Sequence, residues 1–296
     1  MLRQSISSAR LSLYVGLLCL ASVGWEMGAL AADPAPATPP APPSPPIFVD
    51  KNLEKAVRRY VFEKRDTDKP IVEADVVNLS TLEARGMGIT NLAGLEKCRS
   101  LALIDLSRNR ITDVSALKGL GMLQSLTLSD NALENVAPLA SLNALQYLEL
   151  SRNRLKTLEA VRGLTNLNAL YASSNRIADL SPVLGLKRLS SLYLDDNKIK
   201  SIDGLGGLKG LFTVSLNRNS IADLAPLDGV TTLFNLFIEG NRIRNLTPLI
   251  DIAKKDTEHR FAPFLSVYLK GNPLSSKARK EQVAELKAIG TKVIEQ

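Results

Sequence analysis

The stretch LQSLTLSDNALENVAPLASL, residues 123–142, decides the fold of this 296-residue chain. Asn131 of this stretch is one of seven asparagines that follow one another at a fixed step of 22 residues (131 − 109, and so on over six steps). Apolar residues stand eight, five and three places before each asparagine, and two, five, eight and eleven places after it. A fixed period in the twenties predicts a solenoid, in which one short unit stacks on copies of itself.

Each part of the unit has its own expected conformation. The apolar pair at −5 and −3 has a period of two, which predicts a short strand with those side chains pointing inward. The later apolar residues come at every third position, which favours a 3₁₀ turn or a very short helix on the opposite face. Prolines at +7 should keep that face from forming a long helix; they are Pro138, Pro182, Pro226 and Pro248.

The repeated asparagine has a structural role. After the strand the backbone turns inward and leaves buried N–H and C=O groups that need partners. A carboxamide has donors and acceptors, so it can bond to its own coil and to the next. We therefore predict a structural ladder made of Asn109, Asn131, Asn153, Asn175, Asn197, Asn219, Asn241 and, after a longer interval, Asn272.

The pattern LxxLxLxxNxIxxLxxL resembles the leucine-rich repeat, over about residues 79 to 275. Its 22-residue form is similar to the internalin and phosphatase-regulator subgroup. The resemblance implies an α/β solenoid, a leucine-rich repeat arc. Its parallel β-sheet would lie on the concave face, its 3₁₀ or helical turns on the convex face, and helical caps at both ends. Ligands in this family are usually proteins.

The repeats, residues 79–275, are expected to form about nine coils between two caps. Residues 47–78 form the N-terminal helical cap, with a helix that starts near Asp50. Met87 replaces the asparagine of the first coil, where the ladder can end. Residues 276–296 form the C-terminal cap, with a helix over 276–289 and a last strand over 291–294.

The last interval of the repeat is irregular. The step from Asn241 to Asn272 is 31 residues, so nine are extra (31 − 22). They lie around residues 253–261, and we interpret them as a longer helix on the convex side; a contact loop is the alternative. Phe264 is expected to be the first inward residue of the ninth coil.

The N-terminus indicates export. Residues 1–31 have two arginines, an apolar run and an A-x-A site, which is typical of a secretory signal peptide. An uncleaved anchor is the alternative, and it would be the chain's one membrane contact. Residues 32–46 are rich in proline and alanine and predict an extended linker. We expect a bacterial protein that is periplasmic, secreted or on the cell surface.

Composition argues against several functions. The chain has one histidine, His259, and after removal of residues 1–31 it keeps one cysteine, Cys98, in an apolar slot. Neither a metal site, a cofactor site nor a catalytic triad is expected. The glycines of 204–210 do not match a dinucleotide motif. The net charge is +7; we interpret its basic residues as scattered among acids, which does not predict nucleic-acid binding.

The outer face of the predicted sheet is the candidate site. Residues at −7, −6, −4, −2 and −1 are expected to face solvent. Aromatic residues gather there on the middle and late coils, as in many recognition surfaces. Aromatics also stack across strands without any partner. The predicted partner-binding residues are Tyr147, Glu149, Arg152, Tyr171, Tyr193, Asp195, Phe212, Phe234, Phe237 and Tyr268.

Three functions compete. The first is an exported, non-catalytic module, a monomer that recognises a protein through the concave sheet face, as internalin-like proteins do. The second is a scaffold subunit of the phosphatase-regulatory type, against which the signal peptide speaks. The third is a carbohydrate- or cell-wall-binding surface protein, since aromatic platforms also stack on sugars.

Overall fold

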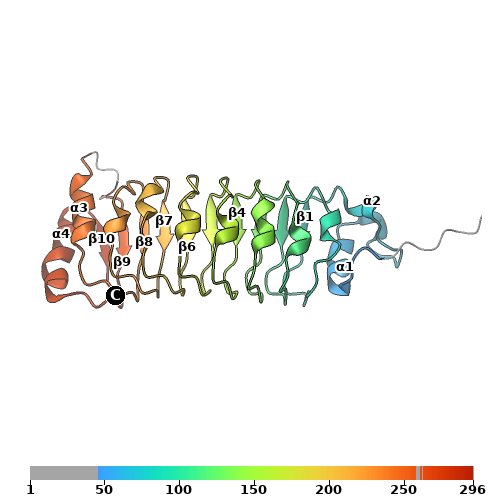
Figure 1. The fold of residues 1–296 in the computed structure, drawn as a ribbon, viewed down its shortest axis with the longest axis horizontal. Helices are drawn as coiled ribbons and strands as arrows, with labels where there is room; N and C mark the ends of the chain where they lie inside the picture. The colour runs from blue at the N-terminus through green and yellow to red at the C-terminus, as the bar shows by residue number, and fades with distance from the viewer. Residues whose placement is uncertain (1–45, 258–260, 262, 296) are drawn as a thin grey trace, which may run out of the picture. The chain divides into compact units, whose positions relative to one another are not determined.

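A computed structural model describes residues 46–257, 261 and 263–295. The predicted signal peptide and all but the last residue of the predicted linker lie outside this range. Within the unit Ser44–Gln296 the strands form a single parallel sheet in chain order (Figure 1). They are β1 (Thr81–Glu83), β2 (Leu103–Asp105), β3 (Ser125–Thr127), β4 (Tyr147–Glu149), β5 (Ala169–Tyr171), β6 (Ser191–Tyr193), β7 (Thr213–Ser215), β8 (Asn235–Phe237), β9 (Ser266–Tyr268) and β10 (Lys292–Ile294).

The register of the sheet follows the sequence repeat. From β1 to β8 each residue pairs with the one 22 places later, so that Tyr171 lies opposite Tyr193 (193 − 171). Between β8 and β9 the step is 31, because Asn235 pairs with Ser266 (266 − 235). The extra residues therefore leave the sheet undisturbed. The parallel sheet that the resemblance to leucine-rich repeats implies is confirmed.

Short 3₁₀ turns form the face opposite the sheet, as the three-residue spacing predicts. They are η2 (Leu95–Lys97), η3 (Ser115–Leu117), η4 (Ala137–Ser141), η5 (Glu159–Val161), η6 (Ser181–Val183), η7 (Leu205–Gly207) and η8 (Ala225–Leu227). The eighth coil instead carries the nine-residue helix α3 (Thr247–Lys255). Pro248 does not prevent this helix. It lies in the first turn, where the missing N–H costs nothing.

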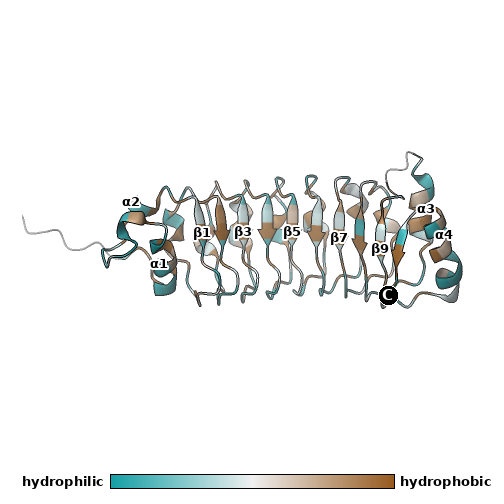
Figure 2. Cartoon of the chain, turned by 180° about the vertical axis from the view of Figure 1, so that it is seen from behind, coloured by the Kyte–Doolittle hydropathy of each residue, from teal (hydrophilic) through white to brown (hydrophobic). Residues whose placement is uncertain are grey.

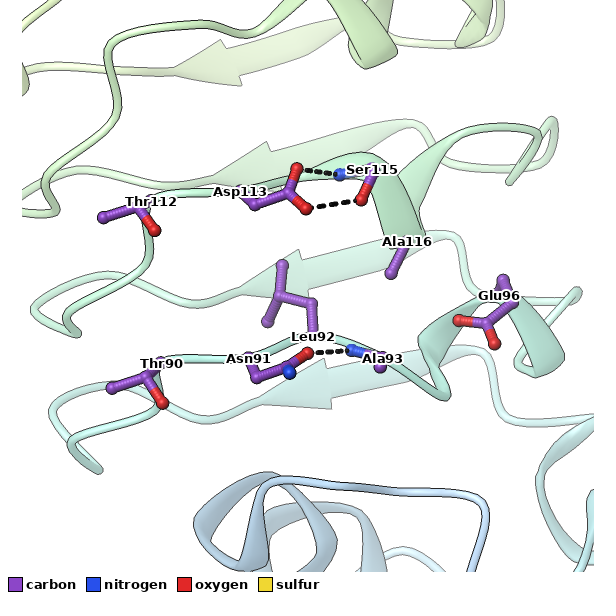
Figure 3. A pocket seen from close by; sticks show the side chains of 9 residues that line it. All are labelled: Thr90, Asn91, Leu92, Ala93, Glu96, Thr112, Asp113, Ser115 and Ala116. Atoms are coloured by element: carbon purple, nitrogen blue, oxygen red, sulfur yellow. Dashed lines mark hydrogen bonds between the residues drawn. The ribbon is translucent and has the colours of Figure 1, made fainter.

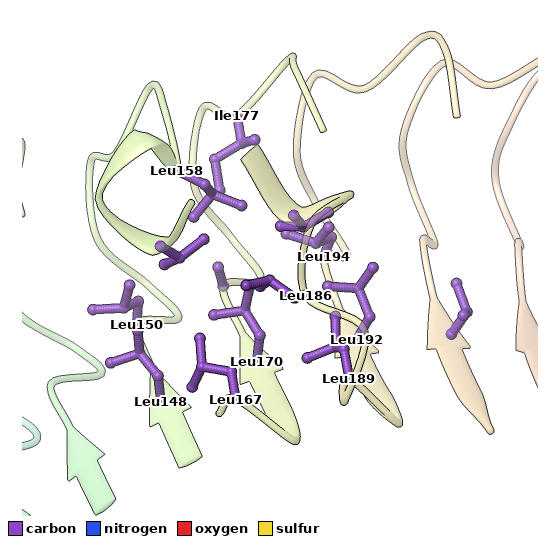
Figure 4. Close-up of a cluster of buried hydrophobic side chains, with 14 of the residues drawn as sticks. Leu148, Leu150, Leu158, Leu167, Leu170, Ile177, Leu186, Leu189, Leu192 and Leu194 are labelled. Carbon is purple, nitrogen blue, oxygen red and sulfur yellow. The ribbon is translucent and has the colours of Figure 1, made fainter. Parts of the chain in front are cut away.

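The core runs between the two faces. All seven apolar slots of the coils from Asn109 to Asn241 are buried. Leu170, for example, is 0% exposed and packs among leucines of its own and neighbouring coils (Figure 4). Because each coil alone leaves its apolar side open, this continuous burial between neighbours stabilises the stack.

The N-terminal cap covers the first coil. It contains α1 (Lys51–Arg58), the 3₁₀ turn η1 (Phe62–Lys64) and α2 (Glu73–Val76). Asp50 is the N-cap of α1, as predicted, and its Oδ1 accepts the N–H groups of Asn52 and Leu53 at 2.8 and 3.2 Å. The Tyr60 hydroxyl accepts the N–H of Glu83 at 3.0 Å. That bond satisfies one backbone donor of β1, the strand at the edge of the sheet.

The C-terminal cap closes the other end. A π-helical turn, η9 (Ala278–Gln282), continues directly into α4 (Val283–Ala288). The predicted last strand is β10, which pairs with β9. The helices α1, α3 and α4 each combine hydrophilic and hydrophobic residues (Figure 2), and Leu53, Leu249 and Leu286 are buried. In the described residues, each helix is too short or too polar to cross a bilayer.

The entry into the ninth coil corrects one prediction. Phe264 is 56% exposed, and its neighbour Leu265 takes the buried place at 0%. The chain arrives through a turn, in which the N–H groups of Phe264 and Leu265 both donate to the carbonyl of Phe261. This turn shifts the inward position by one residue. Spacing counted back from Asn272 could not detect it.

Candidate functional site: the open face of the sheet

The ladder asparagines hold each coil to the preceding coil, next to the sheet. The Nδ2 of Asn175 donates to the carbonyl of Ala172 in its own coil at 3.1 Å and to that of Leu150 in the preceding coil at 3.0 Å. Its Oδ1 accepts the N–H of Leu155 at 2.9 Å. The same two types of bond to the preceding coil recur at the other seven predicted asparagines, including Asn272.

A second ladder lies at the −2 positions, which the sequence analysis assigned to solvent. In several coils these side chains are only partly exposed, because they also bond to the next coil. The hydroxyl of Ser151 accepts the N–H of Ser173, and the hydroxyl of Ser173 accepts that of Asp195. Asp195 in turn accepts the N–H of Asn217, and Asn217 that of Glu239, both at 2.7 Å. Each side chain therefore holds the backbone of the next coil. The sequence signal for this ladder was the column of −2 residues whose side chains can accept a hydrogen bond.

The −1 residues form a row of left-handed turns. Six of them are not glycine, with φ between 52° and 58°: Arg108, Asp130, Arg152, Ser174, Asp196 and Arg218. Such φ values are uncommon for these residue types. The N–H of each one donates to a −2 carbonyl of the next coil, which fixes the turn. Oppositely charged members pair across neighbouring coils, Arg152 with Asp130 at 3.4 Å and Arg218 with Asp196 at 2.5 Å.

The predicted aromatic residues come together in three groups on the sheet. Tyr147, Tyr171 and Tyr193 form a continuous series, with ring centroids 5.3 and 4.7 Å apart. Phe237 stacks on Tyr268 at 4.3 Å. The third group, Phe212 and Phe234, stacks at 5.1 Å and lies just before β7 and β8. Its rings are 49% and 39% exposed, high for large apolar residues.

The aromatic groups border β7. On this strand Thr213 and Ser215 are 8% and 3% exposed, whereas the outward residues of the other described strands are all more open. The Ser215 hydroxyl donates to Asp195 Oδ1 at 2.6 Å. Ser215 stands between Tyr193 and Phe237 in the −4 column, so it divides the tyrosine series from the pair Phe237–Tyr268. A small polar strip therefore lies between two apolar platforms.

The polar residues of the predicted site line a recess of about 340 Å³ where the strands end. Glu149, Arg152 and Asp195 all border it. Burial raises the pKa of Glu149, although the N–H of Ser151 donates to its carboxylate. Burial, together with the nearby Glu149 carboxylate, raises the pKa of Tyr147 to about 12. The phenol of Tyr147 therefore stays neutral at ordinary pH and is available as a donor.

Another depression, of about 620 Å³, lies beside η2 and η3 (Figure 3). Its polar groups are engaged locally. Asp113 accepts the N–H and hydroxyl of Ser115, and Asn91 accepts the N–H of Ala93. The same N–H acceptance recurs at the +4 position of later coils, where it caps the following turn. This depression is a product of the repeat.

The described part of the sheet face carries no cluster of metal-ligating side chains. Within residues 46–257, 261 and 263–295, His, Cys, Asp and Glu side chains form no group suited to a metal ion. Cys98 is 0% exposed, and burial raises its pKa to about 12, so the reactive thiolate is suppressed. His259 lies outside the described residues. The face presents ring surfaces and hydrogen-bonding groups, which suit binding.

These features define a class: a leucine-rich repeat solenoid with an open sheet face. Two family models match, "Leucine Rich repeats (2 copies)" over residues 165–207 and "Leucine rich repeat" over residues 136–177. None of the curated proteins compared with the chain matches it.

Comparison with solved structures indicates which leucine-rich repeat proteins the chain resembles. Internalin C2 of Listeria monocytogenes is 30% identical over 75% of this chain and 94% of its own, with a TM-score of 0.68. The chain belongs to the internalin-like leucine-rich repeat proteins. A second internalin of that organism, inlF, shares the fold at 22% identity, covering 84% and 90% of the two chains, with a TM-score of 0.64. The functional domain of its InlJ, which includes a cysteine ladder, is 25% identical over 81% of this chain and 53% of its own, with a TM-score of 0.58.

Proposed function

We propose that this chain is an exported, non-catalytic binding module that recognises a protein partner through the open face of its sheet. The fold is one that serves protein interaction, and the observation that carries the proposal is the arrangement of aromatic rings on that face. Tyr147, Tyr171 and Tyr193 lie side by side on adjacent strands, with ring centroids 5.3 and 4.7 Å apart. Aromatic side chains of this kind supply much of the energy at protein interfaces.

The rigidity of the face supports the same function. Tyr171 and Tyr193 are held by paired strands, by the asparagine ladder behind them and by the −2 ladder beside them. A side chain that is already ordered loses less conformational entropy when a partner binds. The surrounding Glu149, Arg152 and Asp195 add polar groups that can select the partner by charge and hydrogen bonding.

A direct comparison of two double variants tests the proposal. Tyr171→Ala with Tyr193→Ala removes the platform, while Ser125→Ala with Thr127→Ala changes the same face outside it. Proteins cross-linked to each variant in a native bacterial extract are identified, and a candidate is then purified and its affinity measured. We expect roughly a thirtyfold loss for the tyrosine variant, as for an interface hot spot of about 2 kcal/mol. Equal affinity of both folded variants would refute the site.

The exposed rings also favour the carbohydrate alternative. Ring faces that stack on apolar side chains can stack on sugars, and Phe212 and Phe234 are 49% and 39% exposed. Binding of a neutral cell-wall polysaccharide that requires Tyr171 and Tyr193, with no protein captured, would replace the protein partner by a glycan.

Export is a separate part of the proposal. It rests on residues 1–31, whose basic start, apolar run and Ala29-Leu-Ala31 ending match a signal peptide. N-terminal sequencing of the protein recovered from its host, with cell fractionation, tests it. A mature chain that starts at Ala32 outside the cytoplasm is expected, and an intact Met1 in the cytoplasm contradicts it.

A further inference from the structure

A row of basic side chains runs along one lateral side of the solenoid, separate from the sheet face. It consists of residues one and three places after the ladder asparagine. The backbone alternates there between exposed, buried and exposed positions, as at Arg154, Leu155 and Lys156, so both outer residues face solvent. The basic members, all exposed, are Arg110, Arg154, Lys156, Arg176, Lys198, Lys200, Arg242 and Arg244.

The charge of this lateral row is nearly all of one sign. Over the coils from Asn109 to Asn241 its one acidic member is Glu134, which lies 3.9 Å from Arg154. The three acids next to the row, Asp113, Asp179 and Asp223, have carboxylates that cap the following turns. Basic and acidic residues are mixed over these coils as a whole. Along this row alone the charges separate, because the stack brings residues 22 apart into line.

The lateral row is rigid. Each +1 residue donates its backbone N–H to the +2 carbonyl of the preceding coil, as Arg176 does to Leu155 and Lys198 to Ile177, both at 2.8 Å. The +2 N–H is in turn held by a ladder asparagine. The backbone positions of the row are therefore fixed at the coil spacing of about 4.8 Å. The coils of Asn131 and Asn219 carry no basic residue in the row, so two of the intervals between basic coils are twice that length. Six steps from the first coil of the row to the last give a length of about 29 Å.

We propose that the lateral row binds an extended, linear acidic polysaccharide of the polyuronate class. The row is long and only two residues wide, which fits a single extended chain with one carboxylate on each sugar. Its cations are one or two coils apart, which is close to the length of one or two sugar residues in such a chain. Guanidinium groups at the row can bind carboxylates in a bidentate manner.

The composition of the row favours this partner over two other anionic ones, single-stranded nucleic acid and a membrane surface. The +1 and +3 positions hold no aromatic residue in the described coils, and their apolar members there are small, such as Ala132 and Ala178. Binding of single-stranded nucleic acid normally adds stacking on aromatic side chains. Insertion into a bilayer surface needs large apolar side chains. Carboxylate recognition on a polyuronate needs neither.

Fluorescence anisotropy of a labelled polyuronate with the purified full chain tests the proposal. The row variant combines Arg154→Ser, Arg176→Ser, Lys198→Ser and Arg242→Ser. The control variant combines Lys55→Ser, Lys118→Ser, Lys277→Ser and Lys280→Ser, which removes the same charge from exposed positions elsewhere. Thermal melting checks that both fold. We expect the row variant to bind roughly tenfold or more weakly and the control to bind nearly as wild type, because adjacent charge contacts act together.

Additional conditions and variants distinguish binding of the polyuronate at the row from other kinds of binding. Binding should disappear in about 1 M NaCl, where the Debye length is about 3 Å, and should be absent for a neutral glucan of matched length. The Tyr171→Ala, Tyr193→Ala variant should bind the polyuronate normally, since its change lies on the other face. Equal losses in the row and control variants, or no loss in either, would overturn the proposal. So would tighter binding, through the same row, of single-stranded DNA or of anionic vesicles.

Discussion

Asp50 and Thr90 join the N-terminal cap to the first coil of the solenoid. The Oδ2 of Asp50 accepts the backbone N–H of Thr90 at 2.8 Å and its hydroxyl at 3.0 Å. The other carboxylate oxygen caps α1, so one side chain holds two elements that are 40 residues apart in sequence (90 − 50). Burial alone would raise the pKa of Asp50, but the N–H groups of Thr90, Asn91 and Leu53 outweigh it and keep that pKa below 3.8.

Asp50→Asn should therefore destabilise the chain, by about 1–2 kcal/mol, because an amide donor would face the Thr90 and Asn91 donors. The lowered pKa gives the contribution a pH dependence. It is fully present above the ordinary pKa of 3.8 and is lost as pH falls through the lower folded value. Denaturant unfolding of both proteins between neutral pH and pH about 3 measures this. A difference that grows on acidification contradicts the assignment.

Asn175→Leu should lower stability by about 1–3 kcal/mol, because the carbonyls of Leu150 and Ala172 and the N–H of Leu155 would lose their partner. Asn143→Leu, at an exposed position, is the control and should change little. Thermal and chemical unfolding compare the two. If Asn175→Leu melts no lower than its control, the ladder does not stabilise the stack.

Asp195→Ala should cost about 1–2 kcal/mol, since it removes the acceptor of the Ser215 hydroxyl and of the Asn217 N–H. The exposed Asp203→Ala serves as the matched loss of charge. Hydrogen exchange should also show faster exchange at Asn217 in the Asp195 variant alone. Unchanged protection there would mean that the −2 ladder adds nothing to the asparagines.

Gly206→Ala should destabilise η7 much more than Gly163→Ala destabilises the turn after η5. An added Cβ at Gly206 would lie 2.0 Å from the carbonyl oxygen of Asp228 in the next coil, whereas at Gly163 it meets nothing within 4 Å. Backbone must shift in the first case, with a cost of about 1–3 kcal/mol. The measurement is the unfolding midpoint of each variant. Equal midpoints would mean that the coils separate easily at this point.

Cys98 should resist thiol reagents while the chain is folded. Burial raises its pKa to about 12, so the thiolate needed for reaction is scarce even at mildly alkaline pH. A Cys19→Ser background leaves Cys98 as the one reactive group. Labelling is expected to be slow in buffer and fast in denaturant. Rapid stoichiometric labelling of the native chain would show that the first coil opens easily.

Several features of the candidate site follow directly from the repeat. Tyr171 and Tyr193 occupy the same place in adjacent coils, so the stack makes them neighbours. The same reasoning fails for Asp195, because its place predicts a solvated carboxylate. It cannot show that Ser215 and Asn217 turn their donors toward it. It also fails at Phe264, where an irregular turn replaces the repeat.

The sequence by itself determined the coil: a residue's place in the 22-residue period specifies whether its side chain enters the core, joins the asparagine ladder or faces outward. Tertiary structure alone decided which outward residues act together. The −2 ladder from Ser151 to Glu239, the polar strip at Ser215 and the basic row from Arg110 to Arg244 exist only between coils. The reason is physical: hydrogen bonds and charges act over a few ångströms, and only stacking brings residues 22 apart to that distance.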